Sequence, residues 1–120
     1  MYEIMIETTF DAAHCLPGYD GICRRLHGHT YKVQARFRAR SVMESGIALD
    51  FRTAKMLVSE ATDYMDHQYI NELPAFLDDT PTAENVAKFI YERVKPECSL
   101  LHSVSVWETP TSCATYYEDE

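Results

Sequence analysis

The stretch that decides how this chain folds is Cys23-Arg24-Arg25-Leu26-His27-Gly28-His29, which leads directly into a long alternating segment. From residue 27 to residue 39 every second residue is a histidine or an apolar residue. The members of this set are His27, His29, Tyr31, Val33, Ala35, Phe37 and Ala39. Successive side chains of a β-strand point to opposite faces of a sheet, so the pattern predicts a half-buried strand with both histidines on its apolar face.

A second alternating segment lies upstream. Its apolar phase contains Tyr2, Ile4, Ile6, Thr8 and Phe10, which predicts another half-buried strand. Residues 16–25 contain Pro17, Gly18 and Gly21 and are typical of a loop. His14 therefore lies where a strand gives way to a loop, in the phase that faces the same way as the two later histidines.

Two helices are predicted in the middle of the chain. Asp50 can cap the first, whose apolar residues recur at intervals of three and four: Phe51, Ala54, Leu57, Val58, Ala61 and Met65. Thr82 can cap the second, which ends at Lys95-Pro96. Its apolar residues are Val86, Phe89, Ile90 and Val94.

The C-terminal part returns to strand patterns over residues 100–107 and 114–117. The predicted order is ββααββ, an α+β fold in which two helices cover one face of an antiparallel sheet. With 120 residues, the chain has the size of one domain, residues 1–120.

Composition narrows the possible partners and compartments. A net charge of -8 argues against nucleic acid or an anionic membrane surface as the main partner. No apolar run approaches the roughly 20 residues that cross a bilayer, and the N-terminus lacks a signal-peptide pattern, so we expect a cytoplasmic protein. The four cysteines form no CxxC pair and are expected to be free thiols.

The histidines form a candidate metal site. Two imidazoles at positions i and i+2 of a strand can share one ion, although a bare pair of this kind is more often two hydrogen-bonded histidines at the end of a sheet. With His14 as a third nitrogen ligand, the set suits Zn²⁺ and leaves one position open. Cys23 has three interpretations: a fourth ligand that closes a structural zinc site, a reactive thiol favoured by Arg24 and Arg25, or a cysteine with no special role.

Two further sites contain carboxylates. Asp66-His67 places a carboxylate beside an imidazole, a combination that is common on surfaces but can also form a proton shuttle. Glu108 follows Val104 and Val106 in phase, so it should be buried and need a paired donor. A ring with two parallel N–H groups, such as a 2-amino-4-oxo pterin or guanine, would satisfy it.

Six motifs follow one another over nearly the whole chain: Phe10-Asp11-Ala12-Ala13-His14, the run from Cys23 to His29, Gly46-Ile47-Ala48-Leu49-Asp50-Phe51, Met65-Asp66-His67, Pro81-Thr82-Ala83-Glu84-Asn85 and Trp107-Glu108-Thr109. In this order and at this spacing they resemble the 6-pyruvoyltetrahydropterin synthase family, and most closely its 6-carboxytetrahydropterin synthase branch in the queuosine pathway.

The resemblance implies a role for each matched residue. It implies that His14, His27 and His29 are zinc ligands, that Cys23 is the catalytic thiol, that Asp66 and His67 form the second acid/base group, that Glu108 anchors the pterin ring and that Thr82 helps to frame it.

The resemblance also implies an assembly and a reaction. The tunnelling fold joins ββααββ subunits edge to edge into barrels, usually trimers paired into homohexamers, with active sites between subunits. The implied substrate is 7,8-dihydroneopterin triphosphate, converted to 6-carboxytetrahydropterin, acetaldehyde and triphosphate. Two alternatives remain open: the pyruvoyl branch, which eliminates triphosphate without cleaving the side chain, and a non-catalytic module whose zinc is closed by Cys23.

Overall fold

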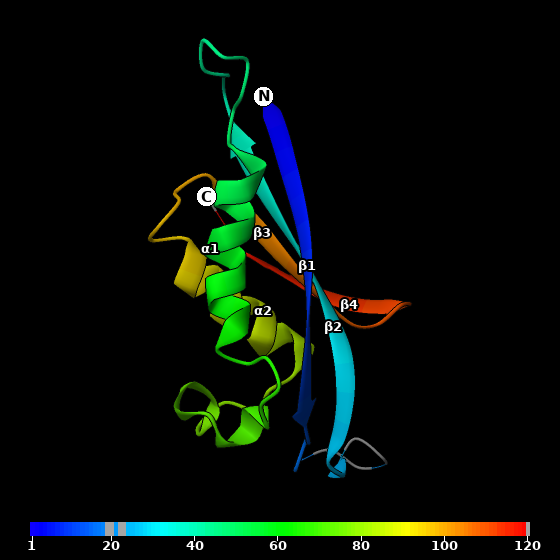
Figure 1. Ribbon diagram of the computed structural model, residues 1–120. Coiled ribbons are helices and arrows are strands. Elements are labelled where there is room, and N and C mark those ends of the chain that lie inside the picture. The colour runs from blue at the N-terminus through cyan, green and yellow to red at the C-terminus, as the bar shows by residue number, and fades with distance from the viewer. Residues whose placement is uncertain (19–20, 22–23, 120) are drawn as a thin grey trace.

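A computed structural model describes residues 1–18, 21 and 24–119, and Figure 1 shows both main helices on the same side of one sheet. The elements are β1 (Tyr2–His14), β2 (His27–Ala39), α1 (Phe51–Asp63), the short 3₁₀ helices η2 (Ile70–Glu72) and η3 (Pro74–Phe76), α2 (Ala83–Val94), β3 (Leu101–Thr109) and β4 (Ser112–Tyr117). The four antiparallel strands are ordered β1-β2-β3-β4, which confirms the predicted fold class.

The long hairpin of β1 and β2 sets the geometry of the histidines. Its register pairs Tyr2 with Ala39 at one end and His14 with His27 at the other. Because side chains alternate between faces, His14, His27 and His29 all lie on the face that the helices cover. The hairpin thus brings together histidines that are separated in sequence by a loop.

The core lies between this face of the sheet and the two helices. α1 packs on β1, and α2 packs on β3 and β4. Fully buried strand residues include Tyr31, Val33, Ala35, Phe37, Val104 and Val106. Among the described residues, none of the helices combines the length and the apolar character needed to cross a membrane.

Both predicted helix caps are confirmed. The Asp50 carboxylate accepts the Arg52 N–H at 2.8 Å, and the Thr82 hydroxyl accepts the Asn85 N–H at 3.1 Å. Phe51 belongs to the apolar spacing of the predicted helix but does not pack in the core: it is the first residue of α1, it is 64% exposed, and it lines an open hollow at the surface.

The segment from Asp66 to Asn71 runs beside the free edge of β1, a placement that periodicity did not predict. Ala13 and Tyr69 form a parallel bridge, and the Ala13 N–H donates to the Gln68 carbonyl at 3.0 Å. These contacts hold the segment against the same end of β1 that contains His14.

Tyr31 is a polar group in an apolar setting. It is fully buried and stacks on Phe10 with ring centroids 4.7 Å apart, and its hydroxyl has no hydrogen-bond partner within the described part of the chain. Burial, and to a lesser degree the charge of Glu108, raises the pKa of Tyr31 well above its usual value.

We expect Tyr31→Phe to raise the free energy of unfolding by about 1 kcal/mol, because it removes a buried hydroxyl that gains nothing in return for its lost hydration. Urea unfolding of the metal-free protein measures the change. Tyr116→Phe serves as the control, since the Tyr116 hydroxyl donates to Glu118 at 3.0 Å in an exposed position. A lower stability of Tyr31→Phe would contradict the prediction.

Candidate metal centre

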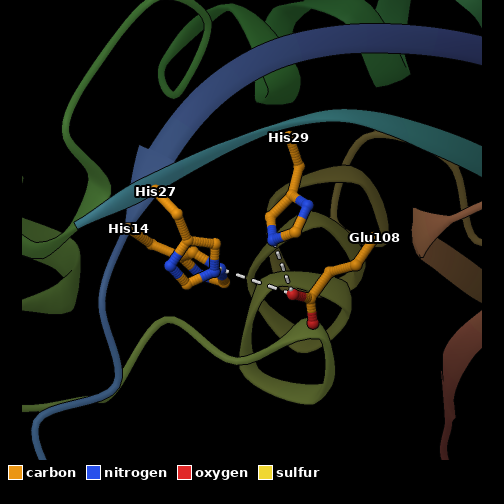
Figure 2. A group of neighbouring side chains, drawn as sticks. All are labelled: His14, His27, His29 and Glu108. Atoms are coloured by element: carbon orange, nitrogen blue, oxygen red, sulfur yellow. Dashed lines mark hydrogen bonds and ion pairs between the residues drawn. The ribbon is translucent and has the colours of Figure 1, made fainter. Parts of the chain in front are cut away.

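Three histidines and one glutamate converge at the end of the sheet (Figure 2). His14 ends β1, His27 and His29 begin β2, and Glu108 lies near the end of β3. The His14 and His27 Nε2 atoms are 3.0 Å apart, and Glu108 Oε1 lies 3.3 Å from His14 Nε2 and 3.1 Å from His29 Nε2. One ligand atom from each of the four residues lies within 4.8 Å of all the others.

The backbone fixes which ring nitrogens face this centre. The Nδ1 atoms of His14 and His27 lie 2.7 Å from the carbonyl oxygens of Pro81 and Arg25, respectively. A carbonyl only accepts, so each Nδ1 carries the proton, and in a neutral ring the lone pair is then on Nε2. Both lone pairs therefore point toward the centre, as in metal-binding histidines held by outer-shell carbonyls.

The contacts inside the cluster fit a cation better than they fit the side chains alone. Two Nε2 lone pairs at 3.0 Å repel each other unless one ring is charged or a cation lies nearby. His29 Nε2 is buried and has no aligned hydrogen bond among the described residues, although Glu108 approaches it. Three nitrogen donors with one neighbouring carboxylate suit Zn²⁺ with an open position.

The electrostatics of the cluster keep its groups in the states that bind metal. Burial lowers the pKa of His29; the Glu108 charge opposes this shift, and a positive charge on His14 or His27 would reinforce it. The neighbouring His14 ring, 3.3 Å from Glu108 Oε1, is the main cause of the lowered pKa of Glu108 and outweighs the effect of partial burial, so the carboxylate is ionised near neutral pH.

Glu108 lies in the phase that the sequence predicted, but it is only partly buried, with 27% of its side chain exposed. The expected burial is incomplete because Glu108 lies near the end of β3, next to the exposed Thr109. Its partners in this structure are His14 and His29.

Asp66 and His67 form a second cluster with Asp11. The Asp66 carboxylate accepts the Asp11 N–H and contacts His67 Nδ1, both at 3.0 Å, and the hydrogen bond from the Asp11 backbone is the main cause of the lowered pKa of Asp66. His67 has a left-handed backbone, with φ of 58°, and donates its N–H to the Asp11 carbonyl. Thr30 donates its hydroxyl proton to the Asp11 carboxylate.

This second cluster lies apart from the histidine centre within one chain. Asp11 and Thr30 occupy the alternate phase of the hairpin, so their side chains leave the sheet on the face opposite His14 and His29. The His67 side chain is 77% exposed. Asp66 and His67 therefore contact each other, but they do not lie beside the candidate metal ligands of the same subunit.

The remaining predicted site residues have different positions. Thr82 caps α2 and directly follows Pro81, whose carbonyl accepts from His14. Cys23 lies outside the described residues. Cys15, Cys98 and Cys113 are free thiols, as expected.

The sheet, its two helices and the three-histidine centre together define an α+β protein. Its candidate metal site lies at the end of the β1–β2 hairpin where His14 pairs with His27. The chain belongs to the 6-pyruvoyl tetrahydropterin synthase family, whose sequence model matches residues 3–119.

Individual relatives agree with this assignment. A 6-carboxy-5,6,7,8-tetrahydropterin synthase of Haemophilus influenzae is 35% identical over 141 residues, covering 98% of this chain and 100% of the relative. A dihydroneopterin monophosphate aldolase of Pyrococcus furiosus is 31% identical over 109 residues, covering 88% and 89%. The structure of a 6-pyruvoyl tetrahydropterin synthase of Caenorhabditis elegans matches with a TM-score of 0.87 at 28% identity and covers 99% of this chain and 98% of that one.

Proposed function

We propose that this protein is a zinc-dependent 6-carboxy-5,6,7,8-tetrahydropterin synthase. It converts 7,8-dihydroneopterin triphosphate to 6-carboxytetrahydropterin with release of acetaldehyde and triphosphate, in queuosine biosynthesis in the cytoplasm. Relatives of this name at 34–36% identity support the activity. The convergence of three histidine Nε2 atoms beside Glu108 is the observation that carries the proposal.

His14, His27 and His29 would hold the zinc, which supplies Lewis-acid polarisation of a substrate oxygen. Glu108 orients the substrate: an ionised carboxylate accepts two parallel N–H groups from the amino-substituted ring of the pterin. The low pKa of Glu108 supports this role, because a protonated carboxyl would lose one of the two acceptors.

Proton transfer falls to two other groups. Asp66 contacts His67 Nδ1, which leaves His67 Nε2 free to take or give a proton. Cys23 is the second proton-transfer group: it moves a proton at the first side-chain carbon of the substrate, and the pair of Asp66 and His67 handles the opposite transfer. Thr82 helps to frame the ring, and the cap that it forms on α2 supports a fixed position for its backbone.

The assembly that we propose is a homohexamer of two trimers, in which residues 1–120 form one tunnelling-fold domain and the sheets join edge to edge. β1 and β4 are the two edges of the sheet, and an edge strand offers unpaired backbone groups to a neighbouring chain. The exposure of His67 and its place opposite the histidine centre support a site to which one subunit gives Asp66 and His67 and another gives Cys23.

The decisive experiment incubates the zinc-loaded protein with 7,8-dihydroneopterin triphosphate and follows acetaldehyde and triphosphate by mass spectrometry. Both products are expected. Triphosphate without acetaldehyde would identify the pyruvoyl branch instead. No turnover, together with sulfur in the zinc shell by X-ray absorption, would identify a structural site closed by Cys23.

A second candidate activity is aldol cleavage of the side chain of a dihydroneopterin. The similarity to the Pyrococcus furiosus aldolase, over 88% of this chain, favours testing it. Dihydroneopterin and its monophosphate should be offered in parallel with the triphosphate. Cleavage of those substrates without any triphosphate release would replace the proposed activity with this one.

Mixing two inactive variants tests whether the sites are shared. We expect Cys23→Ala and His67→Ala to be inactive alone and to recover about a quarter of wild-type activity when they are unfolded and refolded together, because random assembly pairs an intact Cys23 with an intact His67 at that frequency. Mixing without refolding is the control. Failure to recover activity in verified mixed oligomers would place both residues in the same subunit's site.

A further inference from the structure

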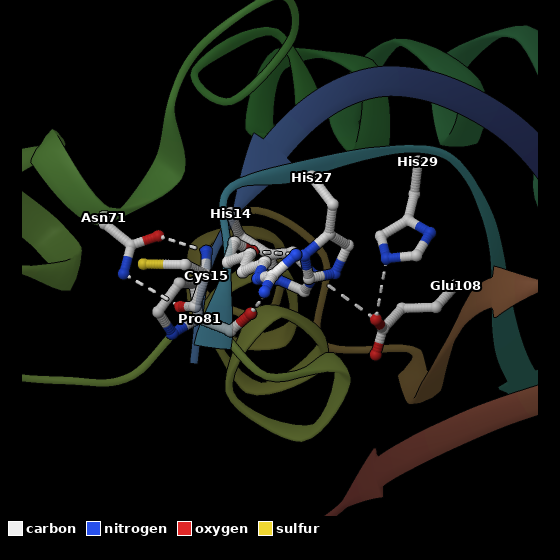
Figure 3. A network of polar contacts seen from close by, with 8 residues as sticks. His14, Cys15, His27, His29, Asn71, Pro81 and Glu108 are labelled. Carbon is white, nitrogen blue, oxygen red and sulfur yellow. Dashed lines mark hydrogen bonds and ion pairs between the residues drawn. The ribbon is translucent and has the colours of Figure 1, made fainter. Parts of the chain in front are cut away.

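The side chain of Asn71 binds the main chain of Cys15 at two points (Figure 3). The Cys15 N–H donates to Asn71 Oδ1 at 3.0 Å, and Asn71 Nδ2 donates to the Cys15 carbonyl at 3.0 Å. Cys15 directly follows His14, so the Asn71 amide binds the backbone next to a candidate metal ligand. Asn71 lies 56 residues away from Cys15 in sequence.

The two hydrogen bonds between Asn71 and Cys15 lie at the point where β1 ends. His14 is the last residue of β1, and its pairing with His27 is the last rung of the ladder between β1 and β2. Beyond that pair the backbone no longer pairs with β2, and backbone order is easily lost where a strand ends. The two hydrogen bonds with Asn71 fix the backbone at the next residue, Cys15.

Neighbouring contacts act in the same direction. The sulfur of Cys15 lies 3.2 Å from the Tyr69 hydroxyl, and the Ala13 N–H donates to Gln68 at 3.0 Å. His14 is therefore flanked on both sides by residues bound to the segment from Gln68 to Asn71, and its own Nδ1–H donates to Pro81 at 2.7 Å. It is also the only fully buried member of the three candidate histidine ligands.

We propose that Asn71 is a positioning residue for the metal centre: by binding both the N–H and the carbonyl of Cys15, it fixes the backbone next to His14 and with it the direction of His14 Nε2. Asn71 does not touch the metal or the substrate in this role. The inference rests on the proposed zinc centre and adds to it a residue outside the ligand set.

The test measures zinc affinity by competition with a chromophoric chelator. Asn71→Ala should bind zinc about 10-fold more weakly, at the lower end of the effect of outer-shell partners. Asn71→Asp keeps the acceptor for the Cys15 N–H, but it replaces the donor with a carboxylate oxygen that faces the Cys15 carbonyl. Because these two acceptors repel each other, its loss of zinc affinity should be at least as large. Cobalt substitution supplies a second readout, since a displaced His14 should change the visible absorption bands of the bound Co²⁺.

Gln34→Ala is the matched control. The Gln34 amide also makes one bond of each kind: it donates to Glu7 at 2.9 Å and accepts from Trp107 at 3.2 Å, on the face of the sheet that the helices leave uncovered. Its removal should lower stability to a similar degree and leave zinc affinity and the cobalt spectrum unchanged. This separates positioning of the metal centre from a general loss of stability.

Three outcomes would overturn the inference. Tight zinc binding by the wild type, with equal affinity and an unchanged cobalt spectrum in Asn71→Ala, would remove the role of Asn71 and leave the proposed function intact. Equal weakening by Gln34→Ala would show that Asn71 contributes only stability. Failure of the wild type to bind zinc would end the proposed function and this inference together. If Asn71→Ala does not fold, Asn71→Asp, which differs by one atom, provides the same comparison.

Discussion

Replacing His29 with alanine should weaken zinc binding by more than about 100-fold, beyond the usual effect of an outer-shell partner, and abolish turnover in parallel. The expectation follows from geometry. His29 Nε2 is buried and has no aligned hydrogen bond within the described residues, and it faces the same centre as the Nε2 atoms of His14 and His27, so it is placed to serve as a metal ligand. Chelator competition and acetaldehyde formation measure the two effects.

The His29→Ala variant should still fold, so a loss of zinc affinity can be assigned to the missing ligand. The side chain lies at the end of the sheet, is 19% exposed and makes no aligned hydrogen bond among the described residues, so its removal breaks no hydrogen bond of the metal-free fold. His102→Ala is the control: that ring stacks on Tyr117, with centroids 6.2 Å apart, and belongs to no described metal cluster. Zinc affinity that survives His29→Ala would move the metal to another ligand set.

Local patterns predicted those parts of the fold whose signals are local. Alternation identified the strands, and helical spacing with Asp50 and Thr82 placed the starts of both helices. Strand phase also placed the three histidines and Glu108 toward one centre, because the side-chain direction on a strand depends only on sequence parity. Phe51 shares the helical spacing but is exposed, because spacing alone does not show whether the first residue of a helix is covered.

The positioning groups could not be predicted in the same way. The side chains of Asp66 and Asn71 accept hydrogen bonds from the main-chain N–H groups of Asp11 and Cys15, which lie 55 and 56 positions away, and every residue except proline offers such a backbone donor. No spacing in the sequence marks which of them will be used. The edge contact between β1 and the segment from Asp66 to Asn71 decides it, and that contact exists only in the folded chain.

Replacing Cys23 with alanine should lower kcat by about 1,000-fold, within the range of a lost acid–base group, and leave zinc affinity within about 2-fold of wild type. The reason is a division of labour. His14, His27 and His29 already offer three nitrogen donors that point to one centre, and this set suits a zinc ion with an open position for substrate. A thiol that stays off the metal remains able to move a proton.

The alternative role of Cys23, as a zinc ligand, predicts the opposite result, so one experiment separates the two roles. If Cys23 closes a structural zinc site, Cys23→Ala must weaken zinc binding strongly, and X-ray absorption of the wild type must show sulfur bound to zinc. Cys113→Ala controls for thiol loss elsewhere, because Cys113 is an exposed free cysteine on β4. Unchanged zinc affinity combined with lost turnover therefore assigns Cys23 to chemistry, since a residue needed only to hold the metal cannot produce that combination.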